Sequence, residues 1–303
     1  MSWVAMFPGQ GSQQAGMGEE LLDKYSNILI DDFEETLGWS LQETILNSNQ
    51  EEITKTNIAQ PYIFAISYCY GLEAIKKLGL PKVGIGHSLG EYTALSLSEI
   101  LSYKDALKII SVRGKAMQEA VEGSSTTLAA VLTSNLKETI KSVEDLVEQG
   151  VDINISNYND ASQIVIGGSN EDIDYLKLNP KDLQAKRVIQ LDVAGAFHSP
   201  VVSSAKNKVK EVIEEIEFKK GQFSVYMNVD ANIAKLSTVK DQLLNQIDNS
   251  VMFYDQIINI EKFEQPESWY HIGPGNVTAG MVKKSISSKN VKVVNSLDSL
   301  SNI

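Results

Sequence analysis

The segment Gly86-His87-Ser88-Leu89-Gly90 most constrains how this chain folds. It follows a short apolar run, residues 83–85, and precedes a mostly apolar stretch, residues 89–101, so it predicts a sharp turn from a buried strand into a helix. The two glycines let the backbone pass close to its neighbours, and Ser88 then stands at the tip of the turn. There the Leu89 N–H and the helix dipole face any negative charge that forms beside the hydroxyl. The pattern predicts a nucleophilic serine; the alternative is a Gly-Ser turn without a chemical role.

A nucleophilic serine at neutral pH requires a base that accepts its proton. The chain has three histidines. His87 adjoins the serine, where its side chain is expected to point away, and His271 lies within a predicted strand and is expected to be packed. His198 lies on a predicted loop that can reach the turn, so we expect it to be the base rather than a surface histidine. No Asp or Glu stands out as a third member, and a backbone carbonyl or amide could orient the ring in a dyad.

The positive charge is carried by 25 Lys and only two Arg, Arg113 and Arg187. Arg113 lies in a predicted helix, about residues 103–121, whose apolar positions surround it and face inward. Because burying an unpaired guanidinium is costly, Arg113 needs an anion. Its planar fork matches a carboxylate bidentately, which favours the carboxylate of a substrate. A structural ion pair with an Asp or Glu is the alternative.

A glycine-rich loop, residues 8–18, follows the first predicted strand, residues 3–7. Gln14 stands where a dinucleotide-binding fingerprint needs its third glycine, and Met17 stands where a P-loop needs its lysine. Phosphate binding therefore remains only as an alternative. Gln10, held between two glycines, is better placed to lend a backbone or side-chain donor to a neighbouring site.

Residues 124–191 predict a structural unit of their own. Their strand and helix patterns follow the order βαββαβ of a ferredoxin-like unit. We expect this unit to be inserted into a larger α/β domain formed by residues 1–123 and 192–303. In the larger domain the patterns predict helices over about 18–29, 31–47 and 199–216, a long helix ending near Lys77 with Pro61 in its first turn, and strands over 223–228 and 269–275.

Composition excludes several classes of function. A net charge of −12 argues against nonspecific binding to nucleic acid or anionic membranes. The beginning of the chain has no basic region, and no apolar run approaches the roughly 20 residues of a membrane helix, so neither a signal peptide nor a membrane span is expected. The single cysteine, Cys69, lies in an apolar run and predicts a buried thiol in a reduced, cytoplasmic compartment.

Six segments together resemble malonyl-CoA:acyl carrier protein transacylases, in that family's order and spacing across nearly the whole chain. The resemblance implies an α/β fold, in which a hydrolase-like parallel-sheet domain carries an inserted ferredoxin-like subdomain and the active site lies in the cleft between them. The segments are Phe7-Pro8-Gly9-Gln10-Gly11-Ser12-Gln13, Gly86-His87-Ser88-Leu89-Gly90-Glu91, Arg113-Gly114-Lys115-Ala116-Met117, Gln163-Ile164-Val165-Ile166-Gly167-Gly168, Ala196-Phe197-His198-Ser199 and Gly273-Pro274-Gly275.

The resemblance also implies roles for individual residues. Ser88 would carry the acyl group and His198 would act as the base, while Gln10 and the Leu89 N–H would form the oxyanion hole. Arg113 would hold the free carboxylate of malonyl-CoA. The acceptor would be the phosphopantetheine thiol of an acyl carrier protein, and no metal or other cofactor would take part.

The stretch 248–253 departs from the family pattern, because Ser250 replaces a proline and Met252 replaces a polar residue. The resemblance implies that a backbone carbonyl of this stretch orients the His198 ring. A carbonyl survives both changes, but the loss of the proline leaves the rigidity of the loop open.

Three functions are compatible with these features. They are malonyl transfer for fatty-acid or polyketide synthesis, hydrolysis of carrier-bound acyl chains, and noncatalytic docking of a carrier protein. Leu89 and Ala196-Phe197 resemble malonyl-selective members of the family, and a related extender such as a hydroxy- or aminomalonyl unit stays open. Docking of an acidic carrier protein would need local basic patches, and the candidates are Lys181, Lys186 and Arg187, and Lys206, Lys208 and Lys210.

Overall fold

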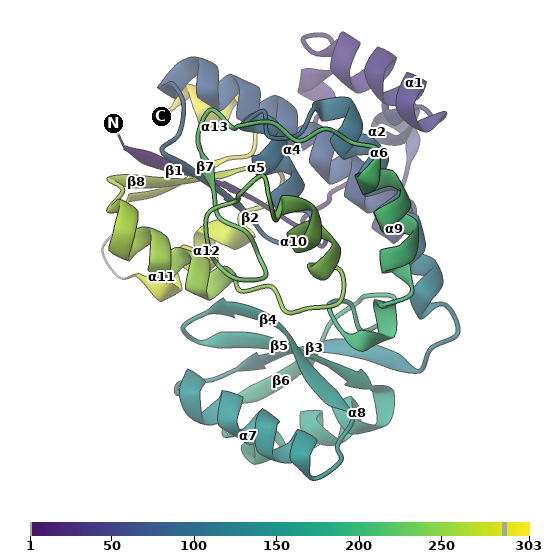
Figure 1. Ribbon diagram of the computed structural model, residues 1–303, viewed down its shortest axis with the longest axis vertical. Helices are drawn as coiled ribbons and strands as arrows, with labels where there is room; N and C mark the ends of the chain where they lie inside the picture. Colours follow the sequence, from purple (N-terminus) through teal and green to yellow (C-terminus); the bar gives the residue numbers. More distant parts are fainter. Residues whose placement is uncertain (1, 287–289) are drawn as a thin grey trace.

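The computed structural model describes residues 2–286 and 290–303, and two β-sheets organise this part of the chain (Figure 1). The larger sheet is parallel and has the strand order β7-β2-β1-β8-β9. The smaller sheet is antiparallel and has the order β4-β5-β3-β6. The strands are β1 (Trp3–Phe7), β2 (Val83–Gly86), β3 (Thr126–Leu132), β4 (Ile153–Asp160), β5 (Gln163–Ser169), β6 (Arg187–Gln190), β7 (Ser224–Val225), β8 (Ser268–Ile272) and β9 (Asn290–Val294).

Helices connect the strands and form the outer layers. None in the described part of the chain is long and apolar enough to cross a membrane. The α-helices are α1 (Phe33–Leu37), α2 (Leu41–Asn47), α3 (Gln50–Thr54), α4 (Thr56–Leu78), α5 (Gly90–Leu97), α6 (Tyr103–Val121), α7 (Leu136–Glu148), α8 (Asn170–Leu178), α9 (Ala205–Glu214), α10 (Val239–Asn245), α11 (Phe253–Glu264), α12 (Val277–Ser285) and α13 (Leu297–Ser301). Short 3₁₀ segments lie at Glu19–Leu21, Pro180–Leu183 and Pro200–Val202, and a π-helical segment lies at Asn27–Asp32.

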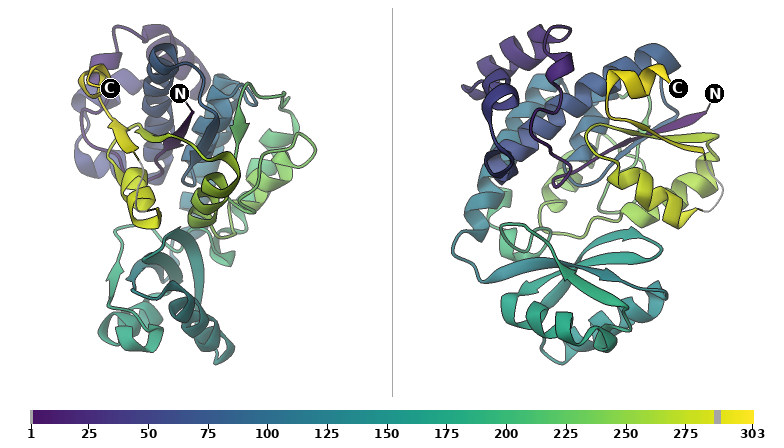
Figure 2. Two further views of the ribbon diagram at one scale, coloured as in Figure 1. Left: turned by 90° about the vertical axis from the view of Figure 1, so that its left-hand side faces the viewer. Right: turned by 180° about the vertical axis from the view of Figure 1, so that it is seen from behind.

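The parallel sheet is covered on both faces, as the views in Figure 2 show. Its first strand, β1, is buried along its whole length, which explains why its sequence is apolar without alternation. Trp3, Ala5 and Phe7 pack into the core that contains α4, α6 and α9. Met6 faces the opposite layer and packs with α11 and α12. The sheet is therefore the middle of three layers.

The antiparallel sheet forms a separate lobe, with α7 and α8 on its outer face (Figure 1). Val131 and Ile166 face these helices and form a core of their own. Leu128 and Val165 face the other way and pack with the core of the parallel-sheet domain. The strand order is that of a ferredoxin-like unit. The predicted fold class is confirmed, while the domain boundaries at 123/124 and 191/192 stay predictions.

Several predicted helices differ from the structure in length or position. Helix α4 begins at Thr56, so the expectation that Pro61 lies in its first turn is wrong. The break falls at Lys55, whose extended ψ of 129° separates α3 from α4. The region 18–47 holds four short segments instead of two helices, because Gly38 takes a left-handed φ of 73° and ends α1. The predicted helix 199–216 is divided, since Pro200 starts a separate 3₁₀ turn before α9.

Other differences have equally local causes. Helix α5 ends at Leu97, and Glu99 takes a left-handed φ of 66° soon after it. Strand β7 is only two residues long, because Tyr226 bridges Ile233 in an antiparallel sense and the chain folds back. No prediction covers α11, α12, α13 or β9. Helix α11 does carry a signal, since its buried positions Phe253, Ile257 and Ile260 follow helical spacing.

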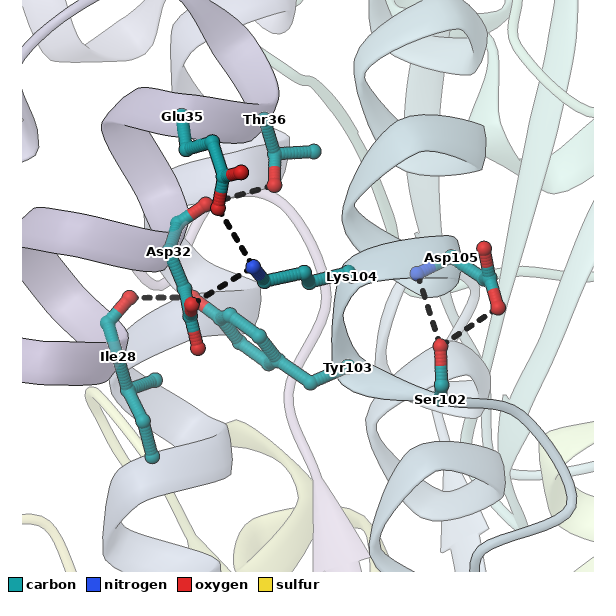
Figure 3. Close-up of polar contacts among 8 residues, drawn as sticks. All are labelled: Ile28, Asp32, Glu35, Thr36, Ser102, Tyr103, Lys104 and Asp105. Atoms are coloured by element: carbon teal, nitrogen blue, oxygen red, sulfur yellow. Dashed lines mark hydrogen bonds and ion pairs between the residues drawn. The ribbon is translucent and has the colours of Figure 1, made fainter.

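The N-terminus of α6 is fixed by side chains from two segments (Figure 3). Ser102 Oγ accepts a hydrogen bond from the Asp105 N–H at 3.1 Å and donates to the Asp105 carboxylate at 2.6 Å. Lys104 Nζ lies 2.9 Å from Asp32 and 2.6 Å from Glu35. The cap satisfies a backbone donor that the helix itself leaves unpaired, and the ion pairs tie α6 to the segment around α1.

We expect Ser102→Ala to lower the free energy of unfolding by about 1 kcal/mol, the usual cost of losing an N-cap. Denaturant unfolding of the purified protein measures this change. The matched control is Ser40→Ala at the start of α2, where the cap contact to the Glu43 N–H is longer, 3.4 Å, and a smaller loss is expected. Equal losses in the two variants would contradict the assignment of Ser102 as the stronger cap.

Candidate active site

The turn between β2 and α5 forms as the sequence predicts. Gly86 ends the strand, Gly90 begins the helix, and Ser88 between them adopts φ 51°. A Cβ on Gly86 would lie 1.9 Å from the Gly90 carbonyl carbon, and one on Gly90 would lie 2.3 Å from the Phe7 carbonyl oxygen. Both positions therefore exclude a larger residue. The Ser88 N–H donates to Asn228 Oδ1 at 2.8 Å, which helps to hold this uncommon backbone conformation.

The loop between β6 and α9 brings His198 to the serine. His198 Nε2 lies 2.7 Å from Ser88 Oγ, and His198 Nδ1 lies 2.8 Å from the carbonyl oxygen of Gln246. Because a carbonyl oxygen only accepts, Nδ1 carries the ring proton and Nε2 is left to accept the proton of the serine. The nearest orienting carbonyl belongs to Gln246, just before the stretch 248–253, and the Asn249 backbone within that stretch also favours the proton on the ring.

The stretch 248–253 also joins the two lobes. The Val251 N–H donates to the Ser156 carbonyl at 2.9 Å, and the Tyr158 N–H donates to the Val251 carbonyl at 2.9 Å. Ser250, at the position of the family's proline, donates its hydroxyl to the Ile155 carbonyl at 2.5 Å. Main-chain pairing with β4 therefore holds this stretch without the proline.

The His198 ring is buried, and its surroundings keep it neutral. Burial lowers the pKa of His198 to about 3, and the nearby positive charge of Arg113 acts in the same direction. The hydrogen bond to the Gln246 carbonyl opposes this shift without cancelling it. At neutral pH the ring is therefore in the form that can accept a proton.

Arg113 is 1% exposed, and its guanidinium lies beside the serine. Nη2 donates to Ser88 Oγ at 2.9 Å and to Gln246 Oε1 at 2.9 Å, and Nη1 donates to Gln60 Oε1 at 2.7 Å. Across residues 2–286 and 290–303, no Asp or Glu forms an ion pair with Arg113. The structural ion pair that the sequence left open is therefore absent from the described structure. The guanidinium is held by neutral groups only.

A cavity of about 360 Å³ opens over these residues, between the two sheets. Ser88, His198, Arg113, Gln10 and Leu89 all line it, so the structure brings the five predicted site residues together. Further lining residues come from the cleft-facing side of the antiparallel sheet and from α12, and they include Leu128, Ala130, Val165, Val277 and Met281.

Gln10 and Leu89 differ in how their donors are used. The Gln10 side chain is occupied, since its Nε2 donates to Thr56 Oγ1 at 3.1 Å and its Oε1 accepts from Gln60 Nε2 at 3.4 Å. The Leu89 N–H stands at the N-terminus of α5, next to Ser88, and has no hydrogen-bond partner within the described residues. It is therefore an open donor at the tip of the turn.

The other two histidines have different partners. The His87 ring lies 2.9 Å from Asn159 Oδ1, on the antiparallel sheet. His271 is fully buried, with Nδ1 2.6 Å from Thr278 Oγ1 and Nε2 3.1 Å from the Pro274 carbonyl. In the described part of the chain neither ring is hydrogen-bonded to Ser88, as their positions in the sequence predict.

The sequence did not single out four buried polar side chains that surround the site: Gln60, Glu91, Asn228 and Gln246. Only Glu91 carried a local signal, because it directly follows the Gly-rich turn. Among residues 2–286 and 290–303, no group of three or more His, Cys, Asp or Glu is placed to hold a metal ion.

A serine at a strand-to-helix turn, hydrogen-bonded to a buried neutral histidine beside an open backbone donor, is the arrangement of enzymes that transfer acyl groups through a seryl ester. The chain belongs to the acyl transferase domain family, whose sequence profile matches residues 4–300. It is an acyltransferase.

Relatives with this architecture are named for malonyl transfer. The chain is 38% identical over 290 residues to the malonyl CoA-acyl carrier protein transacylase of Bacillus subtilis, covering 94% of this chain and 90% of the relative. It is 32% identical to the polyketide biosynthesis malonyl CoA-acyl carrier protein transacylase PksC of the same organism, covering 92% and 95%. A solved malonyl-transacylase in complex with a type II polyketide acyl-carrier protein superposes with a TM-score of 0.92 at 29% identity, covering 100% of this chain and 98% of the other.

The three histidines generate a prediction about pH. Burial lowers the pKa of His198 to about 3, of His271 to about 4, and of His87 below its usual value. We expect the ring-proton NMR signals of His198 and His271 not to titrate between about pH 8 and 5.5, where an exposed histidine has its pKa near 6.5. A ring that titrates near pH 6.5 would contradict the buried neutral assignment.

The same shifts affect stability. The histidines of the unfolded chain take up protons near pH 6.5, whereas those of the folded chain do so only at lower pH. The free energy of unfolding that this difference contributes is therefore complete above pH 6.5. The free energy of unfolding should fall as the pH drops from about 6.5 toward the lower pKa values of the histidines in the folded chain.

Proposed function

We propose that this chain transfers a malonyl group from malonyl-CoA to the phosphopantetheine thiol of an acyl carrier protein, through an ester on Ser88, for fatty-acid or polyketide synthesis. The observation that carries the proposal is the buried guanidinium of Arg113, 2.9 Å from Ser88 Oγ and held by neutral amides. A buried cation without an anionic partner matches a substrate that brings a free carboxylate. The names of the relatives and of the superposed complex support the same substrates.

The contacts of Arg113 suggest how the carboxylate binds. One N–H of Nη2 and one of Nη1 are used by Gln246 and Gln60. The other N–H of Nη2 donates to Ser88 Oγ, and Arg113 and Ser88 both line the cavity. A malonyl carboxylate that takes the place of this contact and also accepts from the second N–H of Nη1 would form the bidentate pair for which guanidinium is suited, and its thioester carbonyl would lie over Ser88.

The first half-reaction then uses two groups. His198 Nε2 takes the proton of Ser88 as the hydroxyl attacks the thioester carbonyl, and it returns the proton to the departing CoA thiolate. The charge on the tetrahedral oxygen would be met by the Leu89 N–H and by Gln10. Because the Gln10 side chain is already hydrogen-bonded to Thr56 and Gln60, we assign the donation to the Gln10 backbone N–H.

The second half-reaction reverses these roles. The carrier thiol gives its proton to His198 and attacks the malonyl ester, and Ser88 leaves with that proton. The Gln246 carbonyl holds the ring and stabilises its charged form in both steps, so no acidic third member is required. No metal or further cofactor takes part in this scheme, and a reduced cytoplasmic compartment is consistent with the buried Cys69.

The carrier protein requires a basic surface on this acidic chain. Of the two candidate clusters, the one on α9 is already neutralised, since Lys206, Lys208 and Lys210 pair with Asp248, Glu119 and Glu214. Lys181, Lys186 and Arg187 are exposed and form no ion pair with the residues the structure describes. They precede the segment 191–193 that lines the cavity. We therefore favour this second cluster as the docking surface.

The nucleophile and base are tested by mass spectrometry of the intact protein. Malonyl-CoA should add one malonyl mass, and Ser88→Ala should abolish the adduct. His198→Ala should slow loading and transfer by roughly 10²–10⁴-fold, the usual cost of losing a general base. An undiminished adduct on Ser88→Ala would contradict the assignment. An adduct that water alone removes as fast as the carrier thiol would favour the acyl-hydrolase alternative.

The role of Arg113 is tested by the ratio of loading rates for malonyl-CoA and acetyl-CoA. Arg113→Ala should lower this ratio by on the order of 30- to several-thousand-fold, because acetyl-CoA never uses the contact. Arg113→Lys keeps the charge without the fork and should recover only part of the ratio. The control is Lys115→Ala, an exposed position on the same helix. An unchanged ratio in Arg113→Ala would overturn the carboxylate assignment.

A further inference from the structure

Gln246 contacts three residues of the proposed site at once. Its backbone carbonyl holds His198 Nδ1 at 2.8 Å, and its side-chain Oε1 accepts from Arg113 Nη2 at 2.9 Å. Its Nε2 donates to the Ser88 carbonyl at 2.8 Å. The side chain is fully buried. The orientation of this one amide therefore affects both the nucleophile turn and the arginine.

Glu91 is, with the Ser88 carbonyl, one of the acceptors that fix which way that amide faces. Gln246 Nε2 donates to Glu91 Oε2 at 2.6 Å, and the Asn228 N–H donates to Glu91 Oε1 at 2.5 Å. Because the carboxylate accepts at both oxygens, it requires the NH₂ end of Gln246 on its side. The Oε1 end is then turned toward Arg113, where an acceptor is needed. A flipped amide would place two acceptors against each other at the Glu91 end and two donors against each other at the Arg113 end.

Glu91 is fully buried, and its charge depends on the same contacts. Burial raises the pKa of Glu91 to about 8, while the Asn228 N–H, the Gln246 amide and the charge of Arg113 lower it. A carboxyl group in such a place is costly unless it is hydrogen-bonded, and both of its oxygens are. No step of the proposed reaction uses it directly.

We propose that Glu91 is a positioning residue, which orients the Gln246 amide and through it sets the Arg113 guanidinium for the substrate carboxylate. This inference rests on the proposed malonyl transfer. It predicts that Glu91 affects the choice between substrates with and without a carboxylate, and not only the amount of folded protein. Glu91 does not touch the reacting atoms.

The substitution Glu91→Gln tests the proposal with almost no change of shape. A glutamine can accept from Asn228 or from Gln246, but not from both. One buried contact becomes donor against donor, and turning the Gln246 amide would move that conflict to Arg113. We expect the malonyl-to-acetyl loading ratio to fall on the order of 10-fold or more, because the arginine loses its fixed acceptor.

The matched control is Glu73→Gln, which makes the same chemical change in a second buried carboxylate. Glu73 accepts from Lys24 and Tyr25 and does not line the cavity. Its substitution should leave the loading ratio unchanged. If Glu91→Gln does not fold, Glu91→Asp keeps the carboxyl group but shortens the side chain, and it should lower the ratio in the same direction by a smaller factor.

A double-mutant cycle with Gln246→Leu distinguishes an effect of Glu91 that passes through the Gln246 amide from a general loss of stability. Gln246→Leu keeps the backbone carbonyl that holds His198 and removes only the amide. The ratio should fall in this variant, and Glu91→Gln should lower it little further in the same background, because both changes act through one group. If the effects of the two substitutions on the loading ratio are additive, Glu91 does not act through the Gln246 amide and the proposal is overturned.

The outcomes also distinguish this inference from the proposed function. If the unsubstituted chain shows no preference for malonyl-CoA, the proposed function fails first. If the preference is present and Arg113→Ala removes it, while Glu91→Gln and Glu91→Asp both leave it unchanged, only the positioning role of Glu91 is overturned.

Discussion

The site depends on a single electrostatic constraint, which is the burial of the Arg113 guanidinium beside the nucleophile. Burying a cation costs several kcal/mol, and hydrogen bonds to its Nη groups offset part of this cost, whereas its Nε has no hydrogen-bond partner in the described part of the chain. Here the Gln60 and Gln246 amides and the Ser88 hydroxyl accept from its Nη groups, and Arg113 lines the cavity. These neutral groups hold the charge without cancelling it. In the function we propose, the substrate carboxylate is its anionic partner.

Both lobes contribute residues to the site around this charge. The parallel sheet supplies the turn with Ser88, and the loop after the antiparallel sheet supplies His198, whose Nε2 lies 2.7 Å from Ser88 Oγ. The stretch around Val251 pairs with β4 and holds them in that position. Cavity walls also come from both sheets. A carrier-borne thiol would reach the ester between them, where little room is left for water.

Parts of the site could be predicted because their signals are local. Ser88 stands in a five-residue pattern whose glycines have a steric reason, and the buried Arg113 stands out in a chain that otherwise uses lysine. His198 was found by elimination among three histidines. Gln246 could not be found in this way, because nothing next to it in the chain differs from an ordinary surface helix. Its carbonyl lies 2.8 Å from His198 Nδ1 because of where α10 ends in space, which no local pattern in the chain indicates.

The amino-acid sequence by itself determined the strand-to-helix turn, the βαββαβ order of the smaller lobe and the burial of Arg113. Each follows from short-range sterics, hydrophobic periodicity or the cost of an unpaired charge. Only the tertiary structure determined which side chains accept hydrogen bonds from that arginine and which carboxyl group lies beside the Gln246 amide. Gln246 is 133 residues from Arg113, 155 from Glu91 and 158 from Ser88 along the chain. Hydrogen bonds over such separations leave no periodic or local pattern, because they depend on packing that only the complete fold creates.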